Sequence, residues 1–175
     1  MQTQHFTNNN AIDRQLFVKM VLDAWNSHNA RFNKLLDQLT TEQLMAEVAP
    51  GRNRGVYLTS HLIAVSDGML PILGFGEKLY PQLDNDFIFN PDKSGQKMPS
   101  VDELKKYRDD INARLAAHIN QLQPDEWFAK HELISAEDFA KEPHRNKLNI
   151  IINRTNHLGY HLGQLVLLAE PAGRG

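Results

Sequence analysis

Two histidines near the C-terminus have the spacing of a metal-binding pair. His157 and His161 lie in the segment HLGYHLGQ, where the apolar residues recur at helical spacing. Positions four apart in a helix share a face, and their side chains are offset by about 40° around the axis and roughly 6 Å along it. Two neutral imidazoles placed in this way can bind one metal ion. The segment therefore predicts part of a metal site.

Such a site needs a further ligand from another part of the fold. The chain contains no cysteine, which excludes thiolate ligands, disulfides and a cysteine nucleophile. We expect His61, in the segment SHLIAV, to be the third ligand. Asp67 and Glu77 are alternative oxygen ligands or bases, although solvation at the surface is the usual fate of such residues. The simpler alternative is that the histidines bond backbone or water at one end of a helical bundle.

Polar side chains continue along the face of the predicted helix that carries the pair. Asn153 and Gln164 fall on the same stripe as His157 and His161. Buried amides cost free energy unless they find partners, so we expect Asn153 and Gln164 to orient the histidine ligands or a bound water molecule. Position 158 is leucine, where zinc proteases have a glutamate base. A hydrolytic base would have to come from elsewhere in the chain.

Composition limits the class of protein. The chain has 175 residues, 41% of them hydrophobic, and a formal net charge of −2. This is enough for one core, and the scattered lysines and arginines predict no binding to nucleic acid. The N-terminus lacks the apolar core of a signal peptide, and no later run approaches about 18 apolar residues. We therefore expect a soluble cytoplasmic protein that does not bind membranes.

The spacing of apolar residues predicts an all-α fold. Four long amphipathic helices are expected at about 11–39, 60–73, 100–122 and 146–169, the second starting near Ser60 or a few residues earlier. Pro71 should kink or end the second helix, and Ser100 with Glu103 forms a capping box for the third. The expected layout is a flexible segment at 1–10, a single bundle domain at 11–170 and a tail at 171–175. A long connection at 77–98 could cover a site.

Three segments together resemble the DinB superfamily. They are the His61-Leu62 pair, the end of the second helix with the letters LGFG, and the HLGYHLGQ block. The resemblance extends from about residue 11 to 168. It implies a DinB/YfiT-like four-helix bundle of up-down-down-up topology, often a homodimer. It also implies that His61, His157 and His161 bind a divalent metal such as zinc or nickel, with open coordination positions of the catalytic kind.

The resemblance also points to a chemistry. Similar proteins include metal-dependent thiol transferases that use bacillithiol or mycothiol, and maleylpyruvate isomerases with a thiol cofactor. A metal-dependent thiol (S-)transferase acting on a small-molecule substrate is therefore the leading expectation, with no acid or base assigned. The alternatives are a non-catalytic binding or interaction protein, and a metal-dependent hydrolase using Asp67 or Glu77. Gly159 and Gly163 indicate a close helix approach, because glycine otherwise weakens a helix.

Overall fold

The described chain is built from helices, as predicted. The computed structural model describes residues 3–169, with side chains from residue 12 onward, and the expected tail at 171–175 lies outside the described residues. The longer helices are α1 (Thr3–Gln38), α3 (Gly55–Asp67), α5 (Val101–Ile119) and α7 (Lys147–Leu165). The shorter ones are α2 (Thr41–Met45), α4 (Met69–Leu73), η1 (Asn85–Phe89), η2 (Pro124–Phe128), α6 (Ala136–Lys141) and η3 (Val166–Leu168).

The first helix begins earlier than the sequence pattern indicated. The backbone of residues 3–10, expected to be flexible, is the first part of α1. No glycine or proline interrupts the sequence between Thr3 and Gln38, so a helix formed by the amphipathic part can continue through the polar residues before it. The amphipathic pattern identified the packed part of α1 and left out its extension.

The second predicted helix is divided into α3 and α4. It begins at Gly55, a few residues before Ser60, and Gly68 separates its two parts. Pro71 lacks the N–H that would bond the carbonyl four residues earlier, and its ring crowds that carbonyl, which explains a break just before it. Gly74 ends α4 in the left-handed conformation, with φ of 78°. The prediction that Pro71 disturbs this helix is consistent with the break at Gly68.

The stretch Gly55–Leu73 is the one part of the described chain long and apolar enough, by composition, to cross a membrane. The sequence-based expectation that no run approaches that length was wrong. Within the protein, however, 67% of the stretch is buried. Other helices of the same chain cover it, as they cover the core helix of a bundle.

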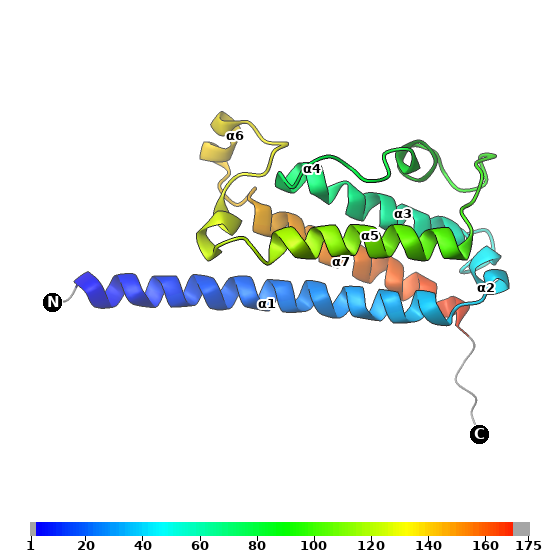
Figure 1. Ribbon diagram of the computed structural model, residues 1–175, viewed down its shortest axis with the longest axis horizontal. Coiled ribbons are helices and arrows are strands. Elements are labelled where there is room, and N and C mark those ends of the chain that lie inside the picture. Colours follow the sequence, from blue (N-terminus) through cyan, green and yellow to red (C-terminus); the bar gives the residue numbers. More distant parts are fainter. Residues whose placement is uncertain (1–2, 170–175) are drawn as a thin grey trace, which may run out of the picture.

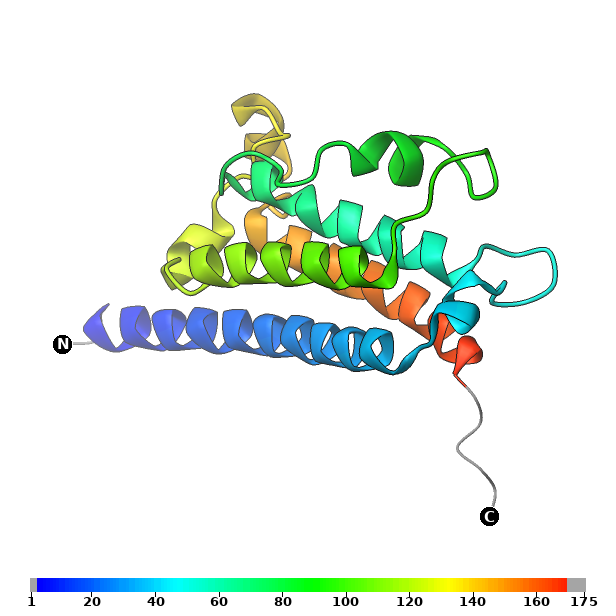
Figure 2. The ribbon, with the colours of Figure 1, turned by 45° about the vertical axis from the view of Figure 1, so that its right-hand side comes forward.

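Four long helical units form the body of the protein. In Figure 1, α1 and α7 run in one direction, whereas α3 with α4 and α5 run in the other. Figures 1 and 2 both show the connection between α4 and α5 returning along the outer side of α3. Helix η1 lies in this connection and packs against α3. The long connection therefore lies over the helix that carries His61.

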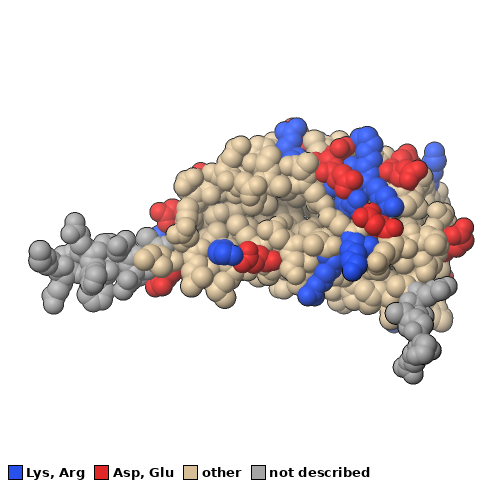
Figure 3. Space-filling model, turned by 60° about the horizontal axis from the view of Figure 1, so that its bottom comes forward, with Lys and Arg blue, Asp and Glu red and all other residues tan. Residues whose placement is uncertain are grey.

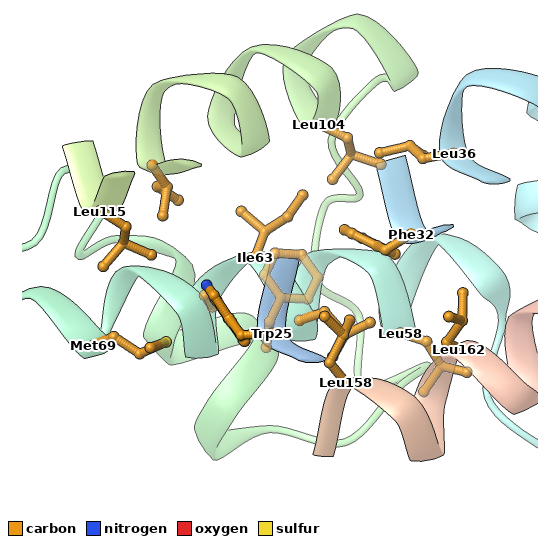
Figure 4. Close-up of a cluster of buried hydrophobic side chains, with 14 of the residues drawn as sticks. Trp25, Phe32, Leu36, Leu58, Ile63, Met69, Leu104, Leu115, Leu158 and Leu162 are labelled. Carbon is orange, nitrogen blue, oxygen red and sulfur yellow. The ribbon is translucent and has the colours of Figure 1, made fainter. Parts of the chain in front are cut away.

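Apolar side chains from all four long helical units form one hydrophobic core. Figure 4 shows apolar side chains from α1, α3, α4, α5 and α7 meeting in one cluster, including Trp25, Phe32, Leu58, Ile63, Met69, Leu115 and Leu158. Helix α1 packs along α7. At Gly159 a Cβ atom would lie 3.2 Å from the ring of His28, whereas at Gly163 it would meet no atom within 4 Å. Within the described chain, the predicted close approach therefore occurs at Gly159, and Gly163 makes no such contact.

Several short helices occupy segments that the sequence pattern did not assign as helix. Thr40 caps the start of α2, with a capping box completed by Gln43. Helix α6 lies between η2 and α7, and Ser135 caps it by accepting from the amide of Asp138. These helices have only a few residues each, too few for apolar periodicity to appear.

Candidate metal centre

Three histidines meet between α3 and α7. His61 lies on α3, and His157 and His161 lie one turn apart on α7. The Nε2 atom of His157 is 3.3 Å from that of His61 and 3.1 Å from that of His161. One nitrogen from each ring lies within 4.8 Å of the others. The structure therefore brings together the three histidines that the sequence predicted, although they are far apart in the chain.

The rings meet with their nitrogen edges and do not stack. The planes of His61 and His157 are inclined by 73°, those of His61 and His161 by 75°, and those of His157 and His161 by 90°. The Nε2 atoms of neighbouring rings face each other across these angles. This is the arrangement in which three imidazoles can bind a single ion.

The other nitrogens of two rings are held by acceptors. His61 Nδ1 lies 2.7 Å from the carbonyl oxygen of Phe87, and His161 Nδ1 lies 2.8 Å from Oε1 of Gln164. A carbonyl oxygen can only accept, so each Nδ1 is the donor in a neutral ring and each Nε2 keeps a free lone pair. These bonds fix both the tautomer and the direction of the ring, as outer partners do for metal-binding histidines.

Burial keeps the imidazoles neutral. Loss of solvation is the main cause that lowers the pKa of His157 to about 4, and the neighbouring imidazoles and Arg154 lower it further. The pKa of His61 is lowered as well, mainly by burial, and the hydrogen bond to Phe87 only partly opposes this shift. Metal binding requires the neutral form of histidine. Near neutral pH both rings are therefore in the form that binds metal.

The donor set fits a divalent cation. In a tetrahedral zinc site with Zn–N distances of about 2.0–2.1 Å, two nitrogen ligands lie about 3.3–3.4 Å apart, close to the two Nε2 separations found here. Two lone pairs face His157, and its one ring proton could satisfy only one of them at a time. A cation would satisfy all three nitrogens. Three histidine ligands also leave at least one coordination position open, as in catalytic zinc sites.

A cavity of about 420 Å³ lies beside the triad. His61 and His157 form part of its wall. Most of the remaining wall is apolar, and its side chains come from α3, α4, the long connection and the segment before α6: Ala64, Val65, Pro71, Ile72, Ile88 and Leu133. A small molecule with an apolar part could be held here next to the triad. As predicted, the long connection after α4 covers part of this site.

Two positively charged side chains line the same cavity, and only one of them has a carboxylate partner among the described residues. Lys78 forms an ion pair with Asp84. Arg154 is partly buried, and among the residues that the structure describes none lies at ion-pair distance from its guanidinium. Loss of solvation lowers the pKa of Arg154. One positive charge therefore faces the cavity without a protein counter-charge from the described part of the chain.

The covering connection is fastened to α3. Buried Asp67 accepts from the backbone amides of Leu79 and Tyr80, each at 2.8 Å. At the far end of the connection, Arg54 forms an ion pair with Asp92 at 2.6 Å. Between these anchors, the carbonyl of Phe87 in η1 accepts from His61. The backbone that orients the first histidine is thus held on both sides.

A hydroxyl adds a further attachment on the same face of α3. The Tyr57 hydroxyl donates to the carbonyl oxygen of Asn90 at 2.8 Å, and the Tyr57 ring lies parallel to that of His61, with an interplanar angle of 9°. Tyr57 stands one turn before His61. One face of α3 therefore carries both the histidine and an attachment for the connection that orients it.

The structure tests two further predictions: the two amides expected to orient the histidines, and the two carboxylates considered as alternative ligands or bases. Gln164 bonds His161, whereas Asn153 is exposed and has no hydrogen bond to the triad among the described contacts. Asp67 is buried and occupied by two amides, contrary to the solvation expected for it, and Glu77 is exposed. Sequence reasoning missed Arg154 and the carbonyl of Phe87. Arg154 stands three residues before His157 and could have been noticed, whereas a backbone carbonyl leaves no sequence signal.

Comparisons with other proteins agree with this architecture. A crystal structure described as the conserved protein of locus from Enterococcus faecalis matches with 15% identity and a TM-score of 0.58, over 86% of this chain and 93% of that one. At this identity the similarity shows the fold alone. Comparison with curated proteins gives no match. A sequence model of the DinB superfamily matches residues 24–165, which include all three histidines. The chain belongs to the DinB superfamily.

Proposed function

We propose that His61, His157 and His161 bind one divalent metal ion, zinc or nickel, through their Nε2 atoms. The observation that carries the proposal is the meeting of three Nε2 atoms, two of them left unprotonated by the Nδ1 bonds to Phe87 and Gln164. When bound, such an ion supplies Lewis acidity, which lowers the pKa of a coordinated thiol or water.

The proposed reaction is transfer of a low-molecular-weight thiol to an electrophile. The sulfur forms a bond to the electrophilic carbon, the leaving group departs with its bonding electron pair, and the thiol proton passes to solvent. The chain has no cysteine, so the sulfur must come from a second small molecule. The apolar cavity wall next to His61 and His157 supports a site for that molecule and the electrophile together.

The residues of the chain have separable roles in this proposal. The apolar wall excludes water and holds the carbon skeleton of the electrophile. His61 and His157 mark the reacting end of the cavity, and the backbone of η1 keeps His61 in place. No acid or base is assigned. Among the cavity-lining residues described there is no carboxylate, so the alternative of metal-dependent hydrolysis has less support.

We also propose the up-down-down-up topology and a homodimer. The helix directions visible in Figure 1 support the topology. Four apolar side chains on α1 are each about half exposed and support a second copy as partner: Ile12, Leu16, Phe17 and Met20.

Charges of both signs are mixed on the face shown in Figure 3, which favours a small-molecule substrate over nucleic acid. A cytoplasmic location belongs to the same proposal, because thiols there are kept reduced.

A conjugation assay tests the proposed function. Metal-free protein is loaded with zinc or nickel and mixed with glutathione, cysteine or bacillithiol and a chlorodinitrobenzene. Metal-dependent turnover that is lost in His161→Ala supports thiol transfer. Cleavage of an ester without any thiol would favour hydrolysis instead. Tight metal binding with neither activity across the thiols would favour the non-catalytic binding protein.

A further inference from the structure

Arg154 is partly buried without a counter-charge among the described residues, and the metal site does not account for this. It stands one turn before His157 on α7, and its side chain forms part of the cavity wall that His61 and His157 also line. It is partly buried, and burial alone accounts for its lowered pKa, because no carboxylate or hydrogen-bond acceptor among the described residues compensates. Arg154 is therefore a partly desolvated cation that lines a space of about 420 Å³.

Three other buried or partly buried cations among the described residues have carboxylate partners. Arg54 is paired with Asp92, Arg108 with Asp37 and Asp109, and Lys78 with Asp84. Removing a cation from water without a counter-charge costs free energy. A partly buried arginine without a counter-charge destabilises the free protein, but it provides a binding site for an anionic ligand that enters the cavity.

We infer that the cavity binds a small molecule with a carboxylate group, which pairs with the guanidinium of Arg154 while its apolar part lies against the cavity wall. The planar guanidinium matches a carboxylate with two parallel hydrogen bonds. A monoanion balances the single free charge, whereas a phosphate dianion would leave excess negative charge in a mostly apolar cavity. The inference rests on the proposed function in taking the triad as the reacting centre.

A matched pair of probes tests the inference on metal-free protein. Phenylacetate and phenylacetamide have nearly the same shape and differ in charge, and binding of each is measured by calorimetry. The wild type is expected to bind phenylacetate about tenfold or more tightly than the amide, as one charge-assisted pair provides. Arg154→Met should abolish the preference, and Arg154→Lys should restore part of it. Equal binding of the two probes by the wild type would overturn the inference.

The control removes the same charge elsewhere on the same helix. Lys147→Met lies at the start of α7, outside the cavity, and should keep the preference for phenylacetate. Arg154→Met should also raise the unfolding midpoint without ligand, because a desolvated charge is replaced by an apolar side chain. If Lys147→Met loses the preference as fully as Arg154→Met, general charge and not Arg154 selects the anion, and the inference is wrong.

Repeating the titrations with zinc separates the two proposals. A preference for phenylacetate that the wild type shows only in the presence of zinc, and that Arg154→Met keeps, would mean that the carboxylate binds the metal, which overturns the role of Arg154. A preference in protein that binds no zinc would support Arg154 while contradicting the metal site. In the conjugation assay the thiols carry a carboxylate and the chlorodinitrobenzene does not, so a KM for the thiol that rises in Arg154→Met would support pairing of Arg154 with the thiol carboxylate.

Discussion

The Nδ1 nitrogen of His61 lies 2.7 Å from the carbonyl oxygen of Phe87. This contact joins a side chain on core helix α3 to the backbone of a connection that lies outside it. The direction of the His61 lone pair therefore depends on how firmly η1 is held. The anchors at Asp67 and Asp92, 25 residues apart in the sequence, become part of the site through this one hydrogen bond.

Asp92→Ala is expected to destabilise the protein and weaken its metal site together. The substitution leaves Arg54 partly buried without its partner, and should lower the free energy of unfolding by about 2–3 kcal/mol. Zinc affinity should fall several-fold, because η1 no longer holds His61 as firmly. Urea unfolding and competition with a chelator measure the two effects. Glu77→Ala, an exposed change in the same connection, should do neither, and an equal loss there would contradict the anchoring role.

Gln164→Leu should weaken metal binding with little effect on folding. The amide oxygen holds His161 Nδ1 at 2.8 Å, and loss of such outer partners typically costs 10–100-fold in metal affinity. Asn153→Leu is the matched control, because Asn153 lies on the same stripe of α7 but is exposed. Zinc affinity by calorimetry should separate the two variants. Equal losses would show that the bond to His161 is not what matters.

The metal-free protein should lose stability as the pH falls from 6.5 toward 4. Because burial holds the pKa of native His157 at about 4, below its ordinary value of 6.5, the unfolded chain binds more protons in this range. A shift of this size corresponds to about 3 kcal/mol, reduced to about 1–2 kcal/mol because the ring is partly solvated. Urea unfolding of the wild type and His157→Gln at pH 7 and pH 5 measures the difference. An unchanged pH dependence in the variant would exclude His157 as its source.

Two glycines on α7 should respond differently to alanine. Gly163→Ala meets open space and should raise the free energy of unfolding by about 0.5–1 kcal/mol, the gain from replacing glycine in a helix. Gly159→Ala would place a Cβ atom 3.2 Å from His28, and the crowding should offset that gain. Thermal unfolding compares the pair. A larger gain at Gly159 would mean that α1 and α7 are not in close contact there.

The sequence predicted the elements whose signal is local and repeated. Helical spacing identified the four long units, and the capping box at Ser100 located the start of α5 correctly. The pair on α7 follows from spacing alone, and family resemblance supported the choice of His61. The extension of α1 to Thr3 was missed because it lacks an apolar stripe. Helix η1 was missed because one short turn shows no period.

Contacts between distant segments could not be predicted from spacing. Asp67 was expected at the surface, and only folding brings the amides of Leu79 and Tyr80 to its carboxylate. Asn153 and Gln164 lie on the same stripe of α7. This stripe is wider than the buried face of the helix, and Asn153 is therefore exposed. The cavity beside Arg154 has walls from five segments of the chain, and no short window of sequence contains them.

The central claim is that His61, His157 and His161 bind one metal ion, and elemental analysis of tag-free protein tests it most directly. The wild type and His144→Ala, an exposed control, should each contain about one equivalent of divalent metal after incubation with zinc or nickel and removal of excess ion. His61→Ala and His157→Ala should contain almost none and keep the same helical circular dichroism. Wild-type protein without bound metal, or full metal content in both variants, would contradict the account.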